Sequence, residues 1–524
     1  MPTYNLLTER WIPVVDLKGS DSELGLLEVL ERAHELREVV DSAPPIQFGL
    51  YRLLVAFVMD AFAIGEIHAL EDQLAQERFD RAVLERYVEA VGPDRFDLFH
   101  PQYPFLQTAP LEGDDDKRKS VAELFFHLPT GSFATHFFHR RADEHALSPA
   151  VCARGLTALA PFTTAGGAGY SPSINGAPPW YVLVQGKSLR ETLLLNCLVL
   201  NDAGLVVPGT PSWRTDGQIT PKQGTACESL LEGLTWRPRH VRLLPGDPGT
   251  CTYSGRPSMA LVRRMVFGPG LKFGSSPWLD PNAAYMLSDN GLNPLRPRED
   301  REPWRDTGPL LLLRRGEHRS EKGQVQFARP PVVEQFHLLR DRGTIDRRRP
   351  VRVEIYGMRT DKMKVFEWDL NRLALPPGVS DNPYAGQLVQ EALNLADSVA
   401  YALRSAVKRA YPRDGEGNEK SFDRLVQMTQ AAYWSDLRCT FQQRFVHELA
   451  AQDPADAEAP GRLMTTWKAE LRKVGWKRLD DALRALDSNA EALRRRVAAL
   501  QGFAAALTAR LDPDPARKER RKKA

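Results

Sequence analysis

The residues from Gly166 to Gly169 carry almost no side-chain atoms, because they read Gly-Gly-Ala-Gly. Glycine adopts a positive φ at little cost, and a main chain without Cβ atoms can approach a partner closely. Nucleotide phosphates are the usual partners of such loops. This stretch, however, has neither the third glycine of a dinucleotide fingerprint nor the Gly-Lys-Ser/Thr ending of a phosphate loop. The pattern indicates either a tight irregular turn or a site of close approach to another molecule.

Three of the eleven histidines, His136, His139 and His145, form a cluster beside Asp143 and Glu144. Their spacing could gather a metal ion, which would be typical of a metal-dependent nuclease. The alternative interpretation is a loop whose basic and aromatic residues face a polyanion. The sequence has no zinc-protease His-Glu-x-x-His pair and no serine nucleophile elbow. We therefore expect a binding protein and not an enzyme, with no catalytic residue, no metal and no cofactor.

A short stretch just before the third histidine mixes aromatic rings with cations and contains Phe138, Arg140 and Arg141. Such a mixture suits single-stranded RNA or splayed bases, which stack on the rings while the cations meet phosphates. The whole chain has a net charge of only +3, so any nucleic-acid surface must be local. Further arginines cluster at 296–305, 314–319 and 340–352, where each cluster can equally be a solvated loop.

The composition is that of an ordinary globular protein, with 42% hydrophobic and 26% charged residues. A length of 524 residues predicts about two to four domains. Five scattered cysteines without a C-x-x-C pair favour a reducing compartment. The sequence shows no long apolar run and no signal-peptide pattern. We therefore expect a cytoplasmic protein with no membrane partner.

The spacing of apolar residues predicts the elements that must position these groups. Helical spacing is found at 24–40, 46–70, 71–91 and 189–200, and short strands are expected at 239–244, 260–267 and 310–314. Strong alternation predicts a β-hairpin over 351–370 with its tip near 358–363. Beyond residue 378 the pattern predicts four amphipathic helices, at about 385–411, 421–451, 459–486 and 488–510.

The predicted fold class is therefore α+β, with a large mixed α/β domain followed by a C-terminal four-helix bundle. We expect the first domain to span residues 1–378 and to contain the glycine stretch and the ring-and-cation loop. The bundle is expected over 379–515, and the basic residues 516–524 are expected to form a disordered tail.

Several motifs, taken in order, resemble one known family, the CasA family, whose members are the large subunit of the type I-E CRISPR surveillance complex Cascade. The resemblance rests on their order and spacing along nearly the whole chain. The motifs are YNLLTERWIPV at 4–14, HPQYPFLQT at 100–108, the glycine stretch leading into GKSLRETLLLNCL at 186–198, PSW at 211–213 and GLTWRPRHVRL at 233–243.

The resemblance implies a non-catalytic subunit that recognises a short protospacer-adjacent motif, the PAM, in duplex DNA from the minor groove. It implies that this subunit starts strand separation for R-loop formation and helps to recruit a helicase-nuclease that acts in trans. The implied partners are guide RNA, the other Cascade subunits and double-stranded target DNA. In such systems protein reads the PAM and base pairing reads the remaining sequence.

The resemblance also implies roles for single residues. The family's PAM-reading glycine loop falls on Gly166, Gly167, Ala168, Gly169 and Tyr170, and its guide-RNA loop falls on Phe138, Arg140 and Arg141. Its basic finger falls near Asn290, in a stretch without lysine. Its strand-separating wedge falls on Thr360, Asp361 and Lys362, with lysine where glutamine is usual.

Two other functions remain open from the sequence. One is a structural scaffold subunit whose helical bundle docks partner subunits. The other is the metal-dependent nuclease that His136, His139, Asp143 and Glu144 would serve. For the bundle, the resemblance implies contact with a small partner subunit and with the displaced strand, and Arg404, Lys408 and Arg409 are candidates for that strand.

Overall fold

The computed structural model forms two units, and each is described here by itself. The first contains Met1–Pro297, Arg314–Arg347 and Val351–Leu373, and the second contains Arg298–Leu313, Arg348–Pro350 and Ala374–Ala524. The residues that the structure describes are 2–108, 110, 114–128, 144–166, 169–201, 204–205, 207–215, 224–274, 278–288, 291–298, 301–312, 326–361, 364–380, 383–412, 418–453, 455–486 and 489–512.

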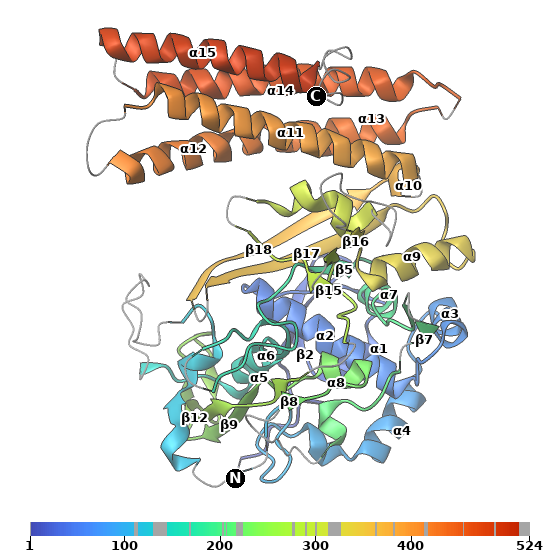
Figure 1. Ribbon diagram of the computed structural model, residues 1–524. Helices are drawn as coiled ribbons and strands as arrows, with labels where there is room; N and C mark the ends of the chain where they lie inside the picture. Colours follow the sequence, from blue (N-terminus) through green and yellow to red (C-terminus); the bar gives the residue numbers. More distant parts are fainter. Residues whose placement is uncertain are drawn as a thin grey trace. The chain divides into compact units, whose positions relative to one another are not determined.

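Helix α2, Pro44–Ala61, runs through the core of the first unit (Figure 1). Nearly all of its residues are buried, including Phe48, Leu54 and Phe57. A helix that is apolar around its whole circumference must be covered on every side, and helices α5 to α8 pack against it. The sequence predicted one helix over 46–70. The chain instead leaves the helix after Ala61 and begins a new one, α3, at Ile67.

A three-stranded sheet lies beside this helix, with the strand order β18-β17-β5. Strand β5 spans Tyr181–Val184, β17 spans Val351–Asp361 and β18 spans Lys364–Leu375. The last two form the hairpin that alternation predicted, and they are joined by only residues 362–363. Tyr356 pairs with Tyr181 in an antiparallel register. The hairpin tip therefore lies at the end of the sheet where β5 begins, and residues 170–180 connect that end to the glycine stretch.

A second sheet has the order β4-β12-β9. Strand β4 is Arg118–Ser120, β9 is Arg239–Pro245 and β12 is Val262–Pro269. Two of these strands lie close to where the sequence predicted them, at 239–244 and 260–267. The strand expected at 310–314 is wrong, because Gly308–Leu312 forms a single turn of π-helix. A short apolar run cannot distinguish a buried strand from a buried helical turn.

The helix expected over 24–40 is also wrong. This segment forms the end of a strand, a short helix and another strand, and the two strands flank β1 in the order β2-β1-β3.

The other elements of the first unit are β1 Ile12–Asp16, β2 Asp21–Leu24, α1 Leu26–Glu31, β3 Leu36–Val39, α3 Ile67–Ala75, α4 Arg81–Val91, α5 Pro149–Thr157, α6 Leu159–Phe162, α7 Leu189–Leu195, β6 Leu200–Asn201, β7 Gly204–Leu205, β8 Gly224–Thr225, α8 Leu230–Leu234, β10 Gly249–Thr250, β11 Pro257–Ser258, β13 Lys272–Phe273, β14 Tyr285–Ser288, β15 Gly291–Pro294, β16 Gln326–Ala328 and α9 Pro331–Asp341.

The second unit is helical (Figure 1). Its central helix, α11, contacts α12, α14 and α15. The four-helix bundle is thus confirmed for the described residues, and with it the α+β fold class. The helices of this unit are α10 Pro377–Ser380, α11 Pro383–Ala410, α12 Asn418–Cys439 continued by a π-helical turn and α13 Val446–Ala450, α14 Ala459–Arg484 and α15 Ala490–Leu511. None of the helices in the described ranges is long and apolar enough to cross a membrane.

A segment distant in sequence completes the bundle. Trp304, in the 3-10 turn Pro303–Asp306, is only 1% exposed. Its ring centroid lies 5.9 Å from that of Trp434 and 5.2 Å from that of Phe441. The neighbouring Arg305 donates to the Asp397 carboxylate of α11 at 2.6 Å. The predicted bundle began only at residue 379, whereas the structure places Arg298–Leu313 in the same compact unit.

Replacing Trp304 by alanine should destabilise the second unit by about 3–5 kcal/mol, because a large buried ring is lost and a cavity remains. Calorimetric unfolding of the full chain should show a lower transition temperature for the bundle. Tyr384→Ala is the control, since Tyr384 belongs to the same unit but is 74% exposed. Equal effects of the two substitutions would contradict this packing.

Candidate nucleic-acid interface

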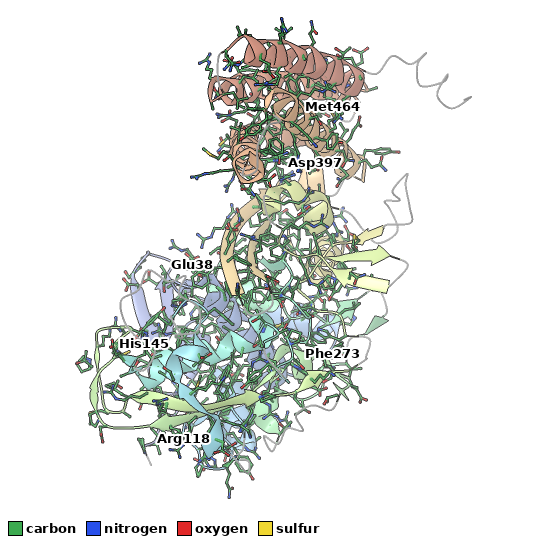
Figure 2. The ribbon with its side chains drawn as sticks, turned by 60° about the vertical axis from the view of Figure 1, so that its left-hand side comes forward. Glu38, Arg118, His145, Phe273, Asp397 and Met464 are labelled. Carbon is green, nitrogen blue, oxygen red and sulfur yellow. The ribbon has the colours of Figure 1, made fainter. Side chains whose placement is uncertain are left out.

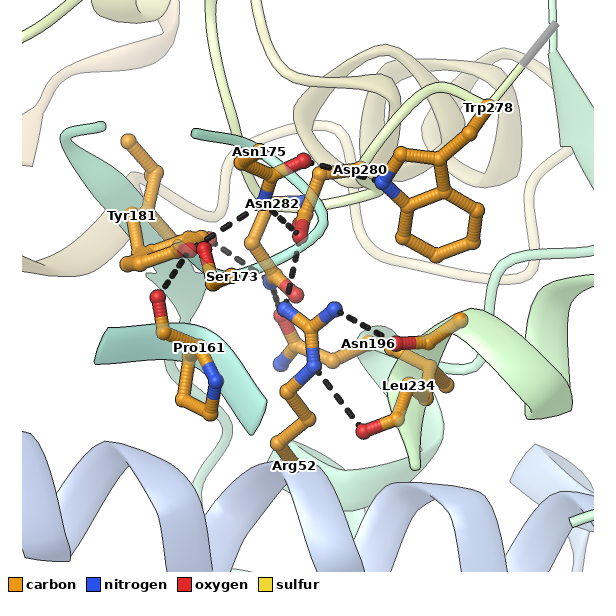
Figure 3. Close-up of polar contacts among 12 residues, drawn as sticks. Arg52, Pro161, Ser173, Asn175, Tyr181, Asn196, Leu234, Trp278, Asp280 and Asn282 are labelled. Atoms are coloured by element: carbon orange, nitrogen blue, oxygen red, sulfur yellow. Dashed lines mark hydrogen bonds and ion pairs between the residues drawn. The ribbon is translucent and has the colours of Figure 1, made fainter. Parts of the chain in front are cut away.

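Buried polar side chains hold the end of the glycine stretch (Figure 3). Asn175, in the turn that follows the glycines, donates through Nδ2 to Asp280 Oδ2 at 2.7 Å. The same carboxylate oxygen accepts from Arg52 Nη1 of helix α2, also at 2.7 Å. Trp278 Nε1 donates to the other side of the amide, Asn175 Oδ1, at 2.9 Å. The amide group of Asn175 is thereby held on both sides by one segment, through Trp278 and Asp280, and Arg52 holds that segment from helix α2.

The start of the stretch is held by the same group of residues. The Tyr181 hydroxyl accepts from Asn175 Nδ2 at 3.1 Å and donates to the carbonyl oxygen of Pro161 at 2.8 Å. Burial, together with the nearby Asp280 carboxylate, raises the pKa of Tyr181, so the hydroxyl keeps the proton that it donates. We call Arg52, Asn175, Tyr181 and Asp280 the anchor network. It joins the two ends of the segment from Pro161 to Asn175.

The ion pair at the centre of the anchor network is fully enclosed. The side chains of Arg52 and Asp280 are 2% and 0% exposed. Arg52 also donates to the carbonyl oxygens of Leu234 and Gly233, at 3.3 and 3.4 Å. A buried pair offsets its desolvation cost only when such additional hydrogen bonds satisfy the remaining donors. These contacts tie the glycine stretch to helix α2 and to the end of α8.

The backbone of the glycine stretch folds back on itself. Gly166 N donates to the carbonyl oxygen of Tyr170 at 3.2 Å, and Ser173 N donates to that of Thr163 at 2.8 Å. Gly166 is half-buried and Gly169 is exposed, with a φ of +87° that side chains rarely allow. Gly167 and Ala168 lie outside the described residues.

Arg239, the first residue of β9, supports both sides of the same loop. Its guanidinium donates to the carbonyl oxygens of Thr164 at 2.5 Å and Ser171 at 2.6 Å. Burial lowers the pKa of Arg239 to about 10, which leaves it charged at neutral pH. A planar guanidinium with several donors suits this bridging position better than a lysine would. The two bonds join Thr164 and Ser171 on either side of the loop, and Gly169 between them is exposed.

Tyr170 lies between two cations. Its ring centroid is 5.0 Å from Lys119 Nζ and 5.1 Å from Arg239 Cζ, within the range of cation–π attraction. Its ring also stacks on that of Phe267, and its hydroxyl donates to the Phe267 carbonyl oxygen at 3.1 Å. These contacts fix the ring against the β4-β12-β9 sheet. Tyr170 is half-buried, so part of the ring remains accessible.

The opposite face of that sheet is basic. Val266 of β12 pairs with Arg118 of β4 and with Arg242 of β9, so both arginines share its face, and Arg264 follows two residues away along β12. Arg118 and Arg264 are exposed and Arg242 is half-buried. Figure 2 marks Arg118 on the first unit. Several cations on one face are what neutralising phosphates requires.

The β17-β18 hairpin is also anchored at its base. Arg372 of β18 donates to Glu354 Oε1 at 2.9 Å and to Glu38 Oε2 of β3 at 2.5 Å. Burial raises the pKa of the Glu354 carboxyl. Tyr356 donates to Glu354 and accepts from Gln47 of α2, the latter at 3.1 Å. The helix that anchors the glycine stretch therefore also contacts the hairpin.

The structure brings some of the predicted site residues together. Gly166, Gly169 and Tyr170 lie in one anchored loop. Thr360 and Asp361 end β17, at the end of the sheet where β5 begins. Thr360 is half-buried and Asp361 is exposed. Several predicted positions lie outside the described residues, namely Gly167, Ala168, Phe138, Arg140, Arg141, Asn290 and Lys362. Their roles stay predictions.

The residues of the nuclease alternative are mostly outside the described ranges too, since only Glu144 is described, and it is exposed. Within the described part of the chain, no group of three His, Cys, Asp or Glu residues could hold a metal ion. The bundle candidates Arg404, Lys408 and Arg409 are all exposed on α11.

Sequence reasoning did not find the anchor network or Arg239. The members of the anchor network are spread over more than two hundred residues of sequence, and only the fold brings them together. A signal was nevertheless present for Arg239, because it lies in the motif GLTWRPRHVRL that carried the resemblance. The bond from Gly176 N to Ser173 O at 2.9 Å closes a turn that contains Asn175, and the Asn-Gly dipeptide found there is typical of turns.

Comparison with known proteins decides the family. The model of the family "CRISPR-associated protein Cse1" matches residues 5–477, most of the chain. The chain belongs to the Cse1 family. A curated relative, the CRISPR-associated protein CasA/Cse1 of Thermus thermophilus, is 29% identical over 506 residues, which cover 90% of this chain and 93% of the relative. The resemblance to the CasA family that the sequence motifs indicated is therefore confirmed.

Solved structures show that this Cse1-family chain has the fold of its relatives. The crystal structure of Thermobifida fusca Cse1 superposes with a TM-score of 0.75 at 21% identity and covers 97% of this chain and 98% of its own. A chain of a solved CRISPR RNA-guided surveillance complex gives a TM-score of 0.68 at 20% identity and covers 95% of this chain and 100% of its own. At these identities the likeness concerns the fold.

Asp280→Ala should destabilise the first unit by about 3–5 kcal/mol, because Arg52 then remains buried without its counter-charge. Calorimetry of the full chain should show this loss, and hydrogen exchange should rise in residues 161–176. Glu85→Ala removes the exposed partner of Arg81, whose side chain is 69% exposed, and should cost less than about 1 kcal/mol. Unchanged exchange in the glycine stretch of the Asp280 variant would show that the pair does not hold the loop.

Proposed function

We propose that this Cse1-family chain is the subunit of a CRISPR RNA-guided surveillance complex, Cascade, that recognises the PAM in duplex DNA from the minor groove. Membership of the family and the likeness to a chain of such a complex support the assembly. The anchored glycine loop is the single observation that carries the DNA-reading role. It combines the exposed Gly169, whose φ is positive, with a base fixed by buried contacts.

The minor groove explains why this tip carries so few side-chain atoms. The groove is about 6 Å wide, so a main chain without Cβ atoms enters where larger groups are excluded. Its edges present mainly hydrogen-bond acceptors, with the guanine amino group as the added donor. Rigid support matters because a loop that is ordered only on binding would lose affinity. Arg239 and Asn175 provide that support before any DNA is present.

Strand separation is assigned to the β17-β18 hairpin. The hairpin is long, is fixed at its base by Arg372 and Glu354, and has its tip at the end of the sheet where β5 begins. A rigid hairpin beside the groove can enter between base pairs once the duplex is held. Thr360, Asp361 and Lys362 would form its end, and Lys362 would meet a phosphate where glutamine would offer an amide.

The remaining contacts follow from the same assembly. Phe138, Arg140 and Arg141 would hold the guide RNA through stacking and charge. The bundle would contact a small partner subunit and, through Arg404, Lys408 and Arg409, the displaced strand. A helicase-nuclease recruited in trans would supply the cleavage chemistry, and this chain would act without catalysis. The basic face at Arg118, Arg242 and Arg264 suits the flanking duplex.

A purely structural scaffold is the second candidate function. It is favoured by the bundle, whose helix α15 carries apolar side chains at Leu493, Val497 and Leu500 that are 38–52% exposed. Such a stripe suits a protein partner. A scaffold, however, gives no reason for an exposed positive-φ glycine beside a clamped tyrosine. The PAM-reading role accounts for both features.

Gly169→Asp should lower the affinity of the assembled complex for PAM-containing duplex by at least about tenfold, because the new side chain and charge meet the groove. A gel shift against duplexes with and without the PAM measures this. Gly19→Asp is the matched control. Gly19 is an exposed glycine with a φ of +92° and no neighbour within 4 Å of an added Cβ, so strain and charge are the same.

Assembly with guide RNA should be unchanged in both variants. Equal affinities of the Gly169 and Gly19 variants for the PAM duplex would contradict the proposed role of the loop. If the complex with the unaltered chain binds duplexes with and without the PAM equally well, the scaffold function would be favoured.

A further inference from the structure

We propose that one face of strand β18 is a stacking site for unpaired bases of the opened DNA, with Phe366 as the stacking ring. The inference rests on the proposed function, because it needs a duplex that opens beside the hairpin. The site consists of Phe366, its cross-strand neighbour Arg359 and the flanking residues Lys364 and Trp368. It is separate from the glycine loop and from the hairpin tip.

Phe366 is exposed without an evident packing reason. Its side chain is 54% exposed, although it lies in a regular strand whose base is buried against β17 and β3. No other phenylalanine or tryptophan whose side chain the structure describes is exposed. A large ring in water costs free energy that a partner's surface can recover. The position of Phe366 therefore points to a partner that covers it.

The chemistry around the ring favours a nucleic-acid partner. Lys364, Phe366 and Trp368 alternate along β18, so they share one face of the hairpin. The Arg359 guanidinium lies 5.1 Å from the Phe366 ring centroid. Rings combined with cations are the platform on which single strands stack, since every base has a flat face and every nucleotide a phosphate. An apolar protein partner would not require this basic surround.

The face also becomes more accessible towards the tip. Trp368 is half-buried, with its ring 5.2 Å from that of His127, while Phe366 and Lys364 are exposed. Phe366 lies three residues beyond residue 363, so it is roughly 10 Å from the end of the hairpin at about 3.3 Å per residue. At about 3.4 Å per nucleotide along one strand, about three nucleotides cover that distance. A base freed at the tip could thus reach the ring.

The location favours DNA over guide RNA. The hairpin tip and the start of β5 lie at the same end of their sheet, and Tyr181 at the start of β5 is tied to the base of the glycine loop through Asn175 and Pro161. A duplex held by that loop would place its first opened bases beside β18. We therefore commit to the first unpaired nucleotides of the target duplex as the occupant.

The test uses the full chain assembled with guide RNA and its partner subunits. The probe is a PAM-containing duplex with a pre-opened bubble beside the PAM and 2-aminopurine at successive unpaired positions, compared with the fully paired duplex. Phe366→Ala removes the ring, Phe366→Trp keeps one, and Leu17→Ala removes an equally exposed apolar side chain elsewhere, which is 51% exposed. Affinity and fluorescence quenching are both measured.

Phe366→Ala should weaken binding of the bubble duplex about five- to tenfold, as expected when one base loses its stacking partner. It should also remove the quenching at one or two positions. Phe366→Trp should preserve both signals, and Leu17→Ala should change neither. The preference for PAM over non-PAM duplex should remain in all variants, because the glycine loop is intact.

Unaltered affinity and quenching in the Phe366→Ala complex would overturn the inference. So would a defect in assembly or in guide-RNA binding, because either would show that the ring covers a protein or RNA surface. Failure of the proposed function is recognised separately, since the unaltered complex would then show no PAM preference on either duplex.

Discussion

The buried ion pair between Arg52 and Asp280 is the contact on which the candidate interface depends. It lies where the core helix α2, the loop before β14 and the glycine stretch meet. A charge enclosed this completely is tolerated only with full hydrogen bonding, and Asn175, Gly233 and Leu234 complete it. The carboxylate also accepts from Asn175 and so determines where the loop ends. Local loop geometry is thereby coupled to the core of the first unit.

The same helix serves two functional elements. Arg52 supports the glycine loop, while Gln47, one and a half turns earlier, contacts Tyr356 of the hairpin. A loop that holds duplex DNA and a hairpin that opens it must keep a fixed separation, because the groove and the first base step are a fixed distance apart. One rigid, fully buried helix is a direct way to meet that requirement. In this account PAM reading and strand opening share a scaffold and do not need a moving part between them.

Much of the fold could be predicted from the sequence because its elements have clear periods. The four bundle helices and the β17-β18 hairpin were located within a few residues, since amphipathic spacing over twenty residues leaves little choice. The errors fall where tertiary contacts override local pattern. The run Leu310–Leu312 is apolar enough for a strand, but packing in the second unit winds it into a π-helical turn. The helix expected over 24–40 was divided by pairing to β1.

The candidate site was predictable only in part. Four small residues in a row predicted a loop of unusual backbone freedom, and the resemblance to the CasA family suggested that duplex DNA is the partner of this loop. The anchor network could not be found, because Arg52, Asn175 and Asp280 become neighbours only through long-range folding.

The central claim is that bare main chain reads DNA from the minor groove. Base analogues separate the two grooves directly. Inosine removes the amino group of guanine from the minor groove and 2,6-diaminopurine adds one at adenine, while 7-deazaguanine alters only the major-groove edge. Binding of the assembled complex should change when PAM bases carry the first two analogues and should be indifferent to the third. Sensitivity to 7-deazaguanine alone would contradict the account.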